Sequence, residues 1–173
     1  MKNLANFILF QVGWFACVMA AGEGHLWLGS IAVLVIVALH LLLITRPSER
    51  RWELGYILCV GVIGMLADTG LNLLGATNYP TVETEWSLAF APPFITALWI
   101  LFATLPNHSL GWLRGRTLLA VIFGAIGGPL AYLGGTRFGA VAVAEEPLLT
   151  YGALALEYAI VTPLLLCLSR RRE

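Results

Sequence analysis

The sequence predicts an all-α polytopic membrane protein, a bundle of six transmembrane helices with both termini in the cytoplasm. Hydrophobic residues make up 59% of the 173 residues and charged residues only 12%, whereas charged residues are about 25% of a soluble domain. Apolar segments follow one another along the whole chain, and basic residues gather in the short links between them. Because no polar stretch is long enough to fold separately, we expect a single domain over residues 1–173.

Six segments approach the length of about 20 apolar residues that a helix needs to cross a hydrocarbon core about 30 Å thick. They are residues 4–21, 26–44, 54–75, 88–105, 117–134 and 148–168. The first is longer than the apolar core of a signal peptide, about 7–15 residues, and contains Gln11, so we expect a span that is retained. The fifth is the least regular, because five glycines and Pro129 fall within 124–135. Beyond it, the apolar residues 138–144 predict an interfacial or re-entrant piece.

The orientation follows from the lysines and arginines of the short links, which favour the cytoplasmic side. With the N-terminus in the cytoplasm, nine of the ten basic residues lie inside and only Arg137 lies outside. The nine are Lys2, Arg46, Arg50, Arg51, Arg114, Arg116, Arg170, Arg171 and Arg172. The predicted outer links instead carry the acidic residues Glu23, Glu83, Glu85, Glu145 and Glu146.

Four polar side chains fall within the predicted spans at depths where they can meet. They are Gln11, Asp68, Asn72 and Glu157. No lysine or arginine lies in the middle of a span, and a charge at mid-membrane costs about 2.5–3.5 kcal/mol on insertion scales. The two carboxyl groups are therefore protonated, or they line a polar cavity, or the four residues only hydrogen-bond helices together, at about 0.6 kcal/mol per contact.

The third span has one face that can be read from its spacing. Gly61, Gly64, Asp68, Asn72 and Gly75 follow one another at intervals of three and four residues, so they form a single stripe. Small residues on a membrane helix let a neighbouring helix approach closely, so the stripe faces protein and Asp68 points into the bundle. We predict that Asp68 and Glu157 share a cavity in the outer half of the bundle, where they are the catalytic candidates, and that the ligand contacts Gln11, Asn72, Trp99 and Tyr158.

Several chemistries are disfavoured by the residues present. The three histidines, His25, His40 and His108, lie on three different segments, and no HExxH motif occurs. Asp68 is the only aspartate, which excludes aspartate-rich metal motifs, and the three cysteines form no CxxC pair. We therefore expect no metal site, no cofactor and no nucleic-acid partner. The expected partners are membrane lipids and a lipidic or small-molecule ligand.

Three motifs give the chain a recognisable pattern: ADTxLNxxG at 67–75, a Pro-Pro pair at 92–93 and GxxGGPxAYxGG at 124–135. Together with the six predicted spans, they resemble an uncharacterised family of bacterial six-span inner-membrane proteins, domain of unknown function 2878. The resemblance implies a multi-pass protein of the bacterial inner (cytoplasmic) membrane. It also implies a role near lipid chemistry, since members are often encoded beside lipid-modifying enzymes such as cyclopropane-fatty-acid-synthase-like proteins. It supplies no catalytic residue.

Three functions stay open from the sequence, and whether the protein is an enzyme is left undecided among them. In the first, the cavity binds a lipid or small apolar molecule and acts on it by carboxylate acid–base chemistry. In the second, Asp68 or Glu157 exchanges protons in a carrier whose three-helix halves have opposite orientations, although the halves share no matching sequence. In the third, the chain is a non-catalytic membrane partner of a lipid-modifying enzyme. Cavity geometry separates the three functions. An enzyme needs a site that is open to lipid or water, a carrier needs a site between two gates, and a scaffold needs no site.

Overall fold

The computed structural model describes residues 2–79, 90–144 and 146–169. Within these ranges the chain forms six α-helices and one pair of two-residue strands, β1 and β2. The helices are α1 (Lys2–Gly22), α2 (Leu26–Leu39), α3 (Arg50–Leu73), α4 (Pro93–Phe102), α5 (Thr117–Arg137) and α6 (Pro147–Leu168). A π-helical turn, His40–Ile44, continues α2, and short 3-10 turns cover Pro47–Glu49 and Gly111–Leu113.

Five helical segments of the described chain are long and apolar enough to cross a membrane. They are Lys2–Gly22, Leu26–Ile44, Pro47–Leu73, Thr117–Arg137 and Pro147–Leu168. The prediction of an all-α membrane bundle is therefore confirmed, and the protein is a multi-pass membrane protein.

Six full spans are not confirmed, because the described part of the fourth segment forms only a short helix. Helix α4 has 10 residues, about 15 Å at 1.5 Å per residue, which is half of a bilayer core. It begins at Pro93 because prolines lack the backbone N–H of a helix interior and fit the first helical position. It ends before a series of turns that contains Pro106. The predicted residues 88–89 of this span lie outside the described residues.

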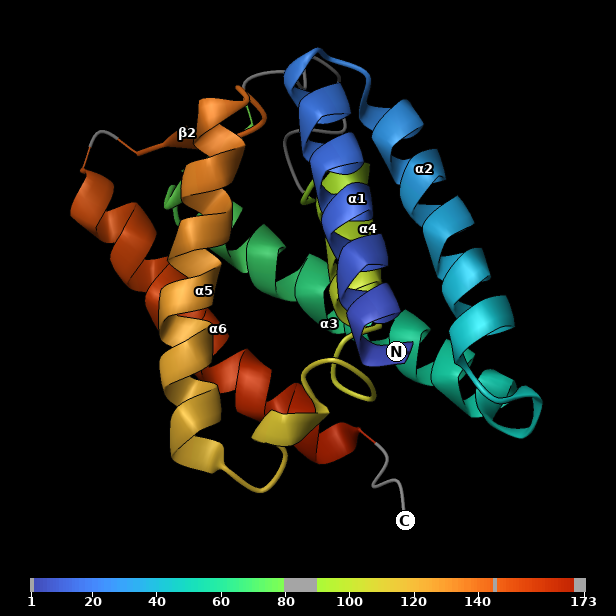
Figure 1. Cartoon of the computed structure of the whole chain (residues 1–173). Helices are drawn as coiled ribbons and strands as arrows, with labels where there is room; N and C mark the ends of the chain where they lie inside the picture. The colour runs from blue at the N-terminus through green and yellow to red at the C-terminus, as the bar shows by residue number, and fades with distance from the viewer. Residues whose placement is uncertain (1, 80–89, 145, 170–173) are drawn as a thin grey trace.

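The short helix is surrounded by protein. Figure 1 shows α1 and α2 as one antiparallel pair and α5 and α6 as another, with α4 beside α1 and α3 crossing behind, and α4 packs against α1, α2 and α3. Irregular backbone is tolerated at membrane depth where protein covers it. Glycines bring the pairs together: a Cβ at Gly29 would lie 2.8 Å from the Cys17 carbonyl oxygen, and one at Gly124 would lie 2.1 Å from that of Tyr158.

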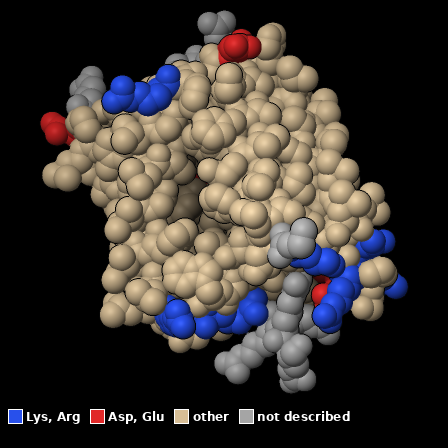
Figure 2. Space-filling model, in the orientation of Figure 1, with Lys and Arg blue, Asp and Glu red and all other residues tan. Residues whose placement is uncertain are grey.

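Both described ends of the chain lie at one end of the bundle, which we call the basic end. There the Lys2 ammonium donates to the Ile44 carbonyl at 3.1 Å, and the Arg114 guanidinium donates to the Ser169 hydroxyl at 3.1 Å. Figure 2 shows the charged side chains at the two ends of the molecule with an uncharged belt between them. That the basic end faces the cytoplasm stays a prediction. The predicted topology residues outside the described ranges are Glu83, Glu85, Glu145, Arg170, Arg171 and Arg172.

At the opposite end, β1 (Thr77–Asn78) pairs antiparallel with β2 (Ala142–Val143). The predicted interfacial piece 138–144 is therefore a turn leading into β2, because its backbone finds hydrogen-bond partners in the link after α3. Helix α5 runs without interruption through Pro129. This small strand pair joins the link after α3 to the link between α5 and α6.

Candidate functional site

A cavity of about 380 Å³ lies within the bundle and is lined by residues of α1, α3, α4, α5 and α6. Its walls are mostly apolar and aromatic. Figure 2 shows a hollow in the uncharged belt of the face that carries α1 and α5. Beyond it, Phe138 contacts the rings of Trp14 and Phe15 at centroid distances of 6.4 and 6.1 Å, which joins α1 to the end of α5. The cavity thus opens between α1 and α5 in the uncharged belt.

Asp68 of α3 lies in the wall of this cavity and is completely buried. Its two carboxyl oxygens accept hydrogen bonds from the Trp99 indole and the Tyr132 hydroxyl. The Trp99 ring also stacks on Tyr158, with centroids 4.9 Å apart and an interplanar angle of 21°. Three aromatic side chains from α4, α5 and α6 therefore hold one carboxyl group in place.

Glycines make room for these aromatic rings. A Cβ at Gly64 would lie 1.9 Å from the Trp99 ring, and one at Gly128 would lie 2.4 Å from the Tyr158 ring. The predicted orientation of α3 is thereby confirmed, since Gly61 and Gly64 face α4 and Asp68 faces the bundle interior. Because position 64 has no side chain, the Trp99 indole can reach the carboxyl group of Asp68, which lies one turn further along α3.

Four of the six predicted site residues line the cavity: Gln11, Asp68, Trp99 and Tyr158. Asn72 and Glu157 are not among the lining residues. Successive residues of a helix point about 100° apart, so when Tyr158 faces the cavity Glu157 points to another side of α6. The structure therefore brings one of the two predicted carboxyl groups to the cavity, and the functional role of each residue stays a prediction.

The Glu157 carboxyl group is buried, and neither oxygen has a hydrogen-bond partner among the described residues. The hydroxyl groups of Thr77 and Tyr79 are also buried, but they lie close to each other, and Tyr79 lies close to Tyr132 and Asp68 as well. Burial raises the pKa of Tyr79, so this hydroxyl keeps its proton. Unpartnered buried polar groups are rare in proteins and mark positions that need an explanation.

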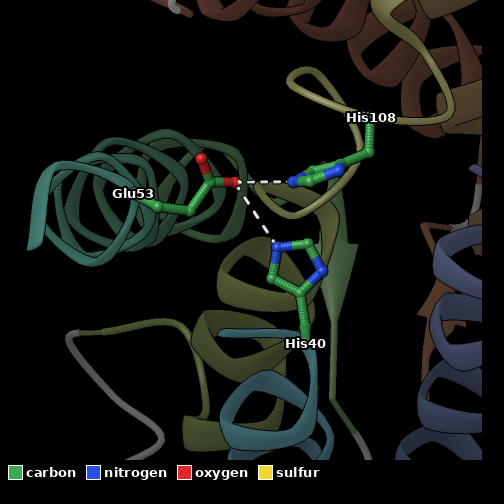
Figure 3. Close-up of side chains that lie close together, drawn as sticks. All are labelled: His40, Glu53 and His108. Atoms are coloured by element: carbon green, nitrogen blue, oxygen red, sulfur yellow. Dashed lines mark hydrogen bonds and ion pairs between the residues drawn. The ribbon is translucent and has the colours of Figure 1, made fainter. Parts of the chain in front are cut away.

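A second polar cluster, shown in Figure 3, lies near the basic end. His40, Glu53 and His108 are each at most 3% exposed. The Nε2 atoms of both histidines lie 3.4 Å from the same oxygen, Oε1 of Glu53. The other oxygen, Oε2, accepts a hydrogen bond from the Asn107 amide at 3.1 Å. The three ligand-type atoms all lie within 4.8 Å of one another, a spacing that suits a metal ion.

The sequence prediction missed this cluster and Tyr132, although spacing could have indicated both. The α3 stripe continues backwards from Asp68 through Gly64, Gly61 and Ile57 to Glu53, at steps of four, three, four and four residues. Glu53 therefore belongs to the buried face of α3, although it lies just outside the predicted span 54–75. On α5, Tyr132 continues the steps of four from 124 and 128. The meeting of His40 with His108 depends on tertiary packing alone.

These features define a class: an all-α multi-pass membrane protein with an apolar cavity in its wall, a buried carboxyl group in that cavity, and a separate histidine–glutamate cluster. Residues 3–164 match the family described as "Protein of unknown function (DUF2878)", so the chain belongs to this family. The match confirms the resemblance seen in the sequence. No curated protein and no solved structure matches the chain.

Proposed function

We propose that this protein binds one lipidic molecule in the cavity, with the ligand entering sideways from the membrane between α1 and α5. The observation that carries the proposal is a cavity of about 380 Å³ with apolar, aromatic walls at the level of the uncharged belt. Ligand pockets are usually about 300–1,000 Å³, mostly apolar, with a few polar groups that fix the ligand. Here Asp68 is the polar group best placed to orient the ligand.

The polar lining indicates what kind of head group the ligand carries. Asp68 is the only charged side chain among the described residues of the wall, and no lysine, arginine or histidine is among them. A carboxylate or phosphate would therefore meet the Asp68 carboxyl group without a cation to balance its charge. A hydroxyl group can instead donate to an oxygen of Asp68 and accept from the Gln11 amide. We infer that the ligand is a long-chain molecule with a neutral hydroxyl group.

The test uses a photoactivatable long-chain alcohol and a substitution that fills the cavity. Gly127 lines the cavity, and a Cβ added there meets no atom within 4 Å. Gly127→Leu should therefore fold normally and place its side chain in the ligand's space. Gly152→Leu, on the exposed side of α6 and equally free of contacts, is the matched control. The purified protein in nanodiscs is irradiated with the probe, and labelled peptides are identified by mass spectrometry.

We expect the probe to label α1 and α5 in the wild type and in Gly152→Leu. In Gly127→Leu, most of the labelling of these two helices should be lost. A fatty acid probe of the same chain length should label these helices less than the alcohol does. Equal labelling of α1 and α5 in the two glycine variants would overturn the proposal and leave the non-catalytic membrane partner as the better hypothesis.

A further inference from the structure

The cluster at the basic end is built from three segments that are far apart in the sequence. His40 begins the π-helical turn after α2, Glu53 lies in the first turn of α3, and His108 lies in the link between α4 and α5. Figure 3 shows both imidazole rings directed at the same end of the Glu53 side chain. This cluster is separate from the cavity that contains Asp68, since none of its three residues lines that cavity.

The distances within the cluster are too long for strong hydrogen bonds. Charge-assisted N–H···O bonds are about 2.7–2.9 Å long, whereas both Nε2 atoms lie 3.4 Å from Oε1 of Glu53. Ligand atoms bound to one zinc ion at about 2.0–2.1 Å in tetrahedral geometry lie about 3.3–3.4 Å apart. Two of the three distances among the ligand atoms thus match the edge of such a tetrahedron, and all three atoms lie within 4.8 Å of one another.

We propose that His40, Glu53 and His108 bind a divalent transition-metal ion, for which Zn²⁺ is the natural probe. Two imidazole nitrogens and one carboxylate oxygen form a ligand set that zinc uses in proteins. The bond from Asn107 to Oε2 keeps Oε1 directed at the two histidines, as partners of metal ligands generally do. The negative charge of Glu53 offsets part of the charge of the ion in this buried site, and a water molecule can supply the fourth ligand.

Asn6 determines how tightly His40 can bind the ion. Its amide nitrogen lies 3.2 Å from Nδ1 of His40 and donates to the Thr104 carbonyl at 3.1 Å. Its oxygen accepts from the backbone and hydroxyl of Ser109 at 3.2 and 2.7 Å. This arrangement makes Nδ1 an acceptor and leaves the imidazole proton on Nε2, which lies 3.2 Å from the Thr45 hydroxyl and 3.4 Å from Oε1 of Glu53. An ion at Nε2 displaces that proton, and the neutral ring must then carry its proton on Nδ1, where a metal-bound histidine normally donates to an acceptor. Asn6 is therefore a positioning residue, and Asn6→Asp should supply that acceptor.

The experiment measures bound zinc in the full chain, purified without a polyhistidine tag and exchanged into metal-free buffer after incubation with Zn²⁺. We expect about one Zn²⁺ per chain in the wild type by elemental mass spectrometry, and a rise in the thermal unfolding temperature on adding Zn²⁺. Glu53→Gln and His108→Gln should each lower zinc affinity at least tenfold and abolish the thermal shift. The matched control is His25→Gln, because His25 is exposed at the opposite end, and it should retain both properties.

Two further measurements separate metal binding from loss of folding. Co²⁺ in place of Zn²⁺ should give the visible absorption bands of a four-coordinate site in the wild type and in His25→Gln but not in His108→Gln. Asn6→Asp should bind Zn²⁺ more tightly than the wild type, a gain that a merely damaged fold would not produce. The proposal is overturned if the wild type retains no more zinc than His108→Gln, or if zinc binding depends on His25 instead of His108. In either case, the three residues would only form hydrogen bonds with one another and would not bind a metal ion.

Discussion

Gly64 and Trp99 are in direct contact across the interface of α3 and α4: a Cβ added to Gly64 would lie 1.9 Å from Cγ of the indole. The indole cannot move away easily, because it donates to Asp68 on one side and stacks on Tyr158. Interiors are packed too densely to absorb such an overlap without strain. The absence of a side chain at position 64 is therefore a condition for the Asp68 site.

From this contact we predict that Gly64→Ala destabilises the protein by about 1–3 kcal/mol, the usual cost of overpacking. Gly55→Ala in the same helix is the control, since nothing lies within 4 Å of a Cβ added there. It should be neutral or stabilising by about 0.5–1 kcal/mol, because alanine favours the helix. Unfolding in mixed micelles of increasing dodecyl sulfate content measures both. Equal stability of the two variants would show that the Trp99 indole can adopt another conformation without loss of stability.

The second prediction concerns the acceptor between Trp99 and Tyr132. Asp68→Leu removes both acceptor oxygens and leaves the indole N–H and the Tyr132 hydroxyl buried without their partner, at about 1–3 kcal/mol for each group. Asp68→Asn should cost less, because the amide oxygen can accept from the indole and the amide nitrogen can donate to the hydroxyl. The expected order of stability is wild type, then Asp68→Asn, then Asp68→Leu. A leucine variant as stable as the asparagine variant would contradict the hydrogen-bonded role.

The third prediction concerns Glu157, whose two buried oxygens have no hydrogen-bond partner among the described residues. Leaving a buried polar group unsatisfied costs about 1–3 kcal/mol, and an apolar side chain of similar size avoids that cost. Glu157→Met should therefore raise the free energy of unfolding by about 1–2 kcal/mol. Glu146→Met, at an exposed position preceding α6, is a control with the same substitution and should have little effect. If Glu157→Met is less stable than the wild type, Glu157 has a partner in the membrane-embedded protein.

The sequence predicted the helices more completely than the sites, for reasons that particular residues make clear. Long apolar segments ending in polar links predict spans well, because the bilayer imposes one length on all of them. The fourth segment is not confirmed as a full span, because hydropathy does not distinguish a helix that crosses a membrane from a short one that α1, α2 and α3 surround. Pro92 and Pro93 are the sequence feature that could have indicated that α4 begins only at Pro93.

The candidate sites were predicted where one helix contains the whole pattern. The stripe through Gly64 placed Asp68 correctly, since helical spacing alone fixes which residues share a face. Glu157 was expected beside Asp68 from depth alone, and depth does not determine rotation about the axis of α6. The cluster of His40 with His108 depends on where the link between α4 and α5 folds back, which no local spacing encodes.

The last prediction fixes which side of the membrane each end of the bundle faces. Six of the seven described lysines and arginines lie at the basic end, and Arg137 lies at the opposite end. Because basic links are retained in the cytoplasm, the basic end should face inward. Single cysteines are introduced at exposed positions of a variant in which Cys17, Cys59 and Cys167 are replaced by alanine. Gly24 tests the opposite end, and Ser48 and Arg116 test the basic end.

A thiol reagent that does not cross membranes should label Gly24→Cys in intact cells, and should label Ser48→Cys and Arg116→Cys only after the cells are opened. All three positions are exposed in the structure, so burial does not explain a difference among them. Labelling of both basic-end positions in intact cells, with Gly24→Cys protected, would reverse the orientation. It would also place the histidine–glutamate cluster on the outer side, where it would meet external instead of cytoplasmic zinc.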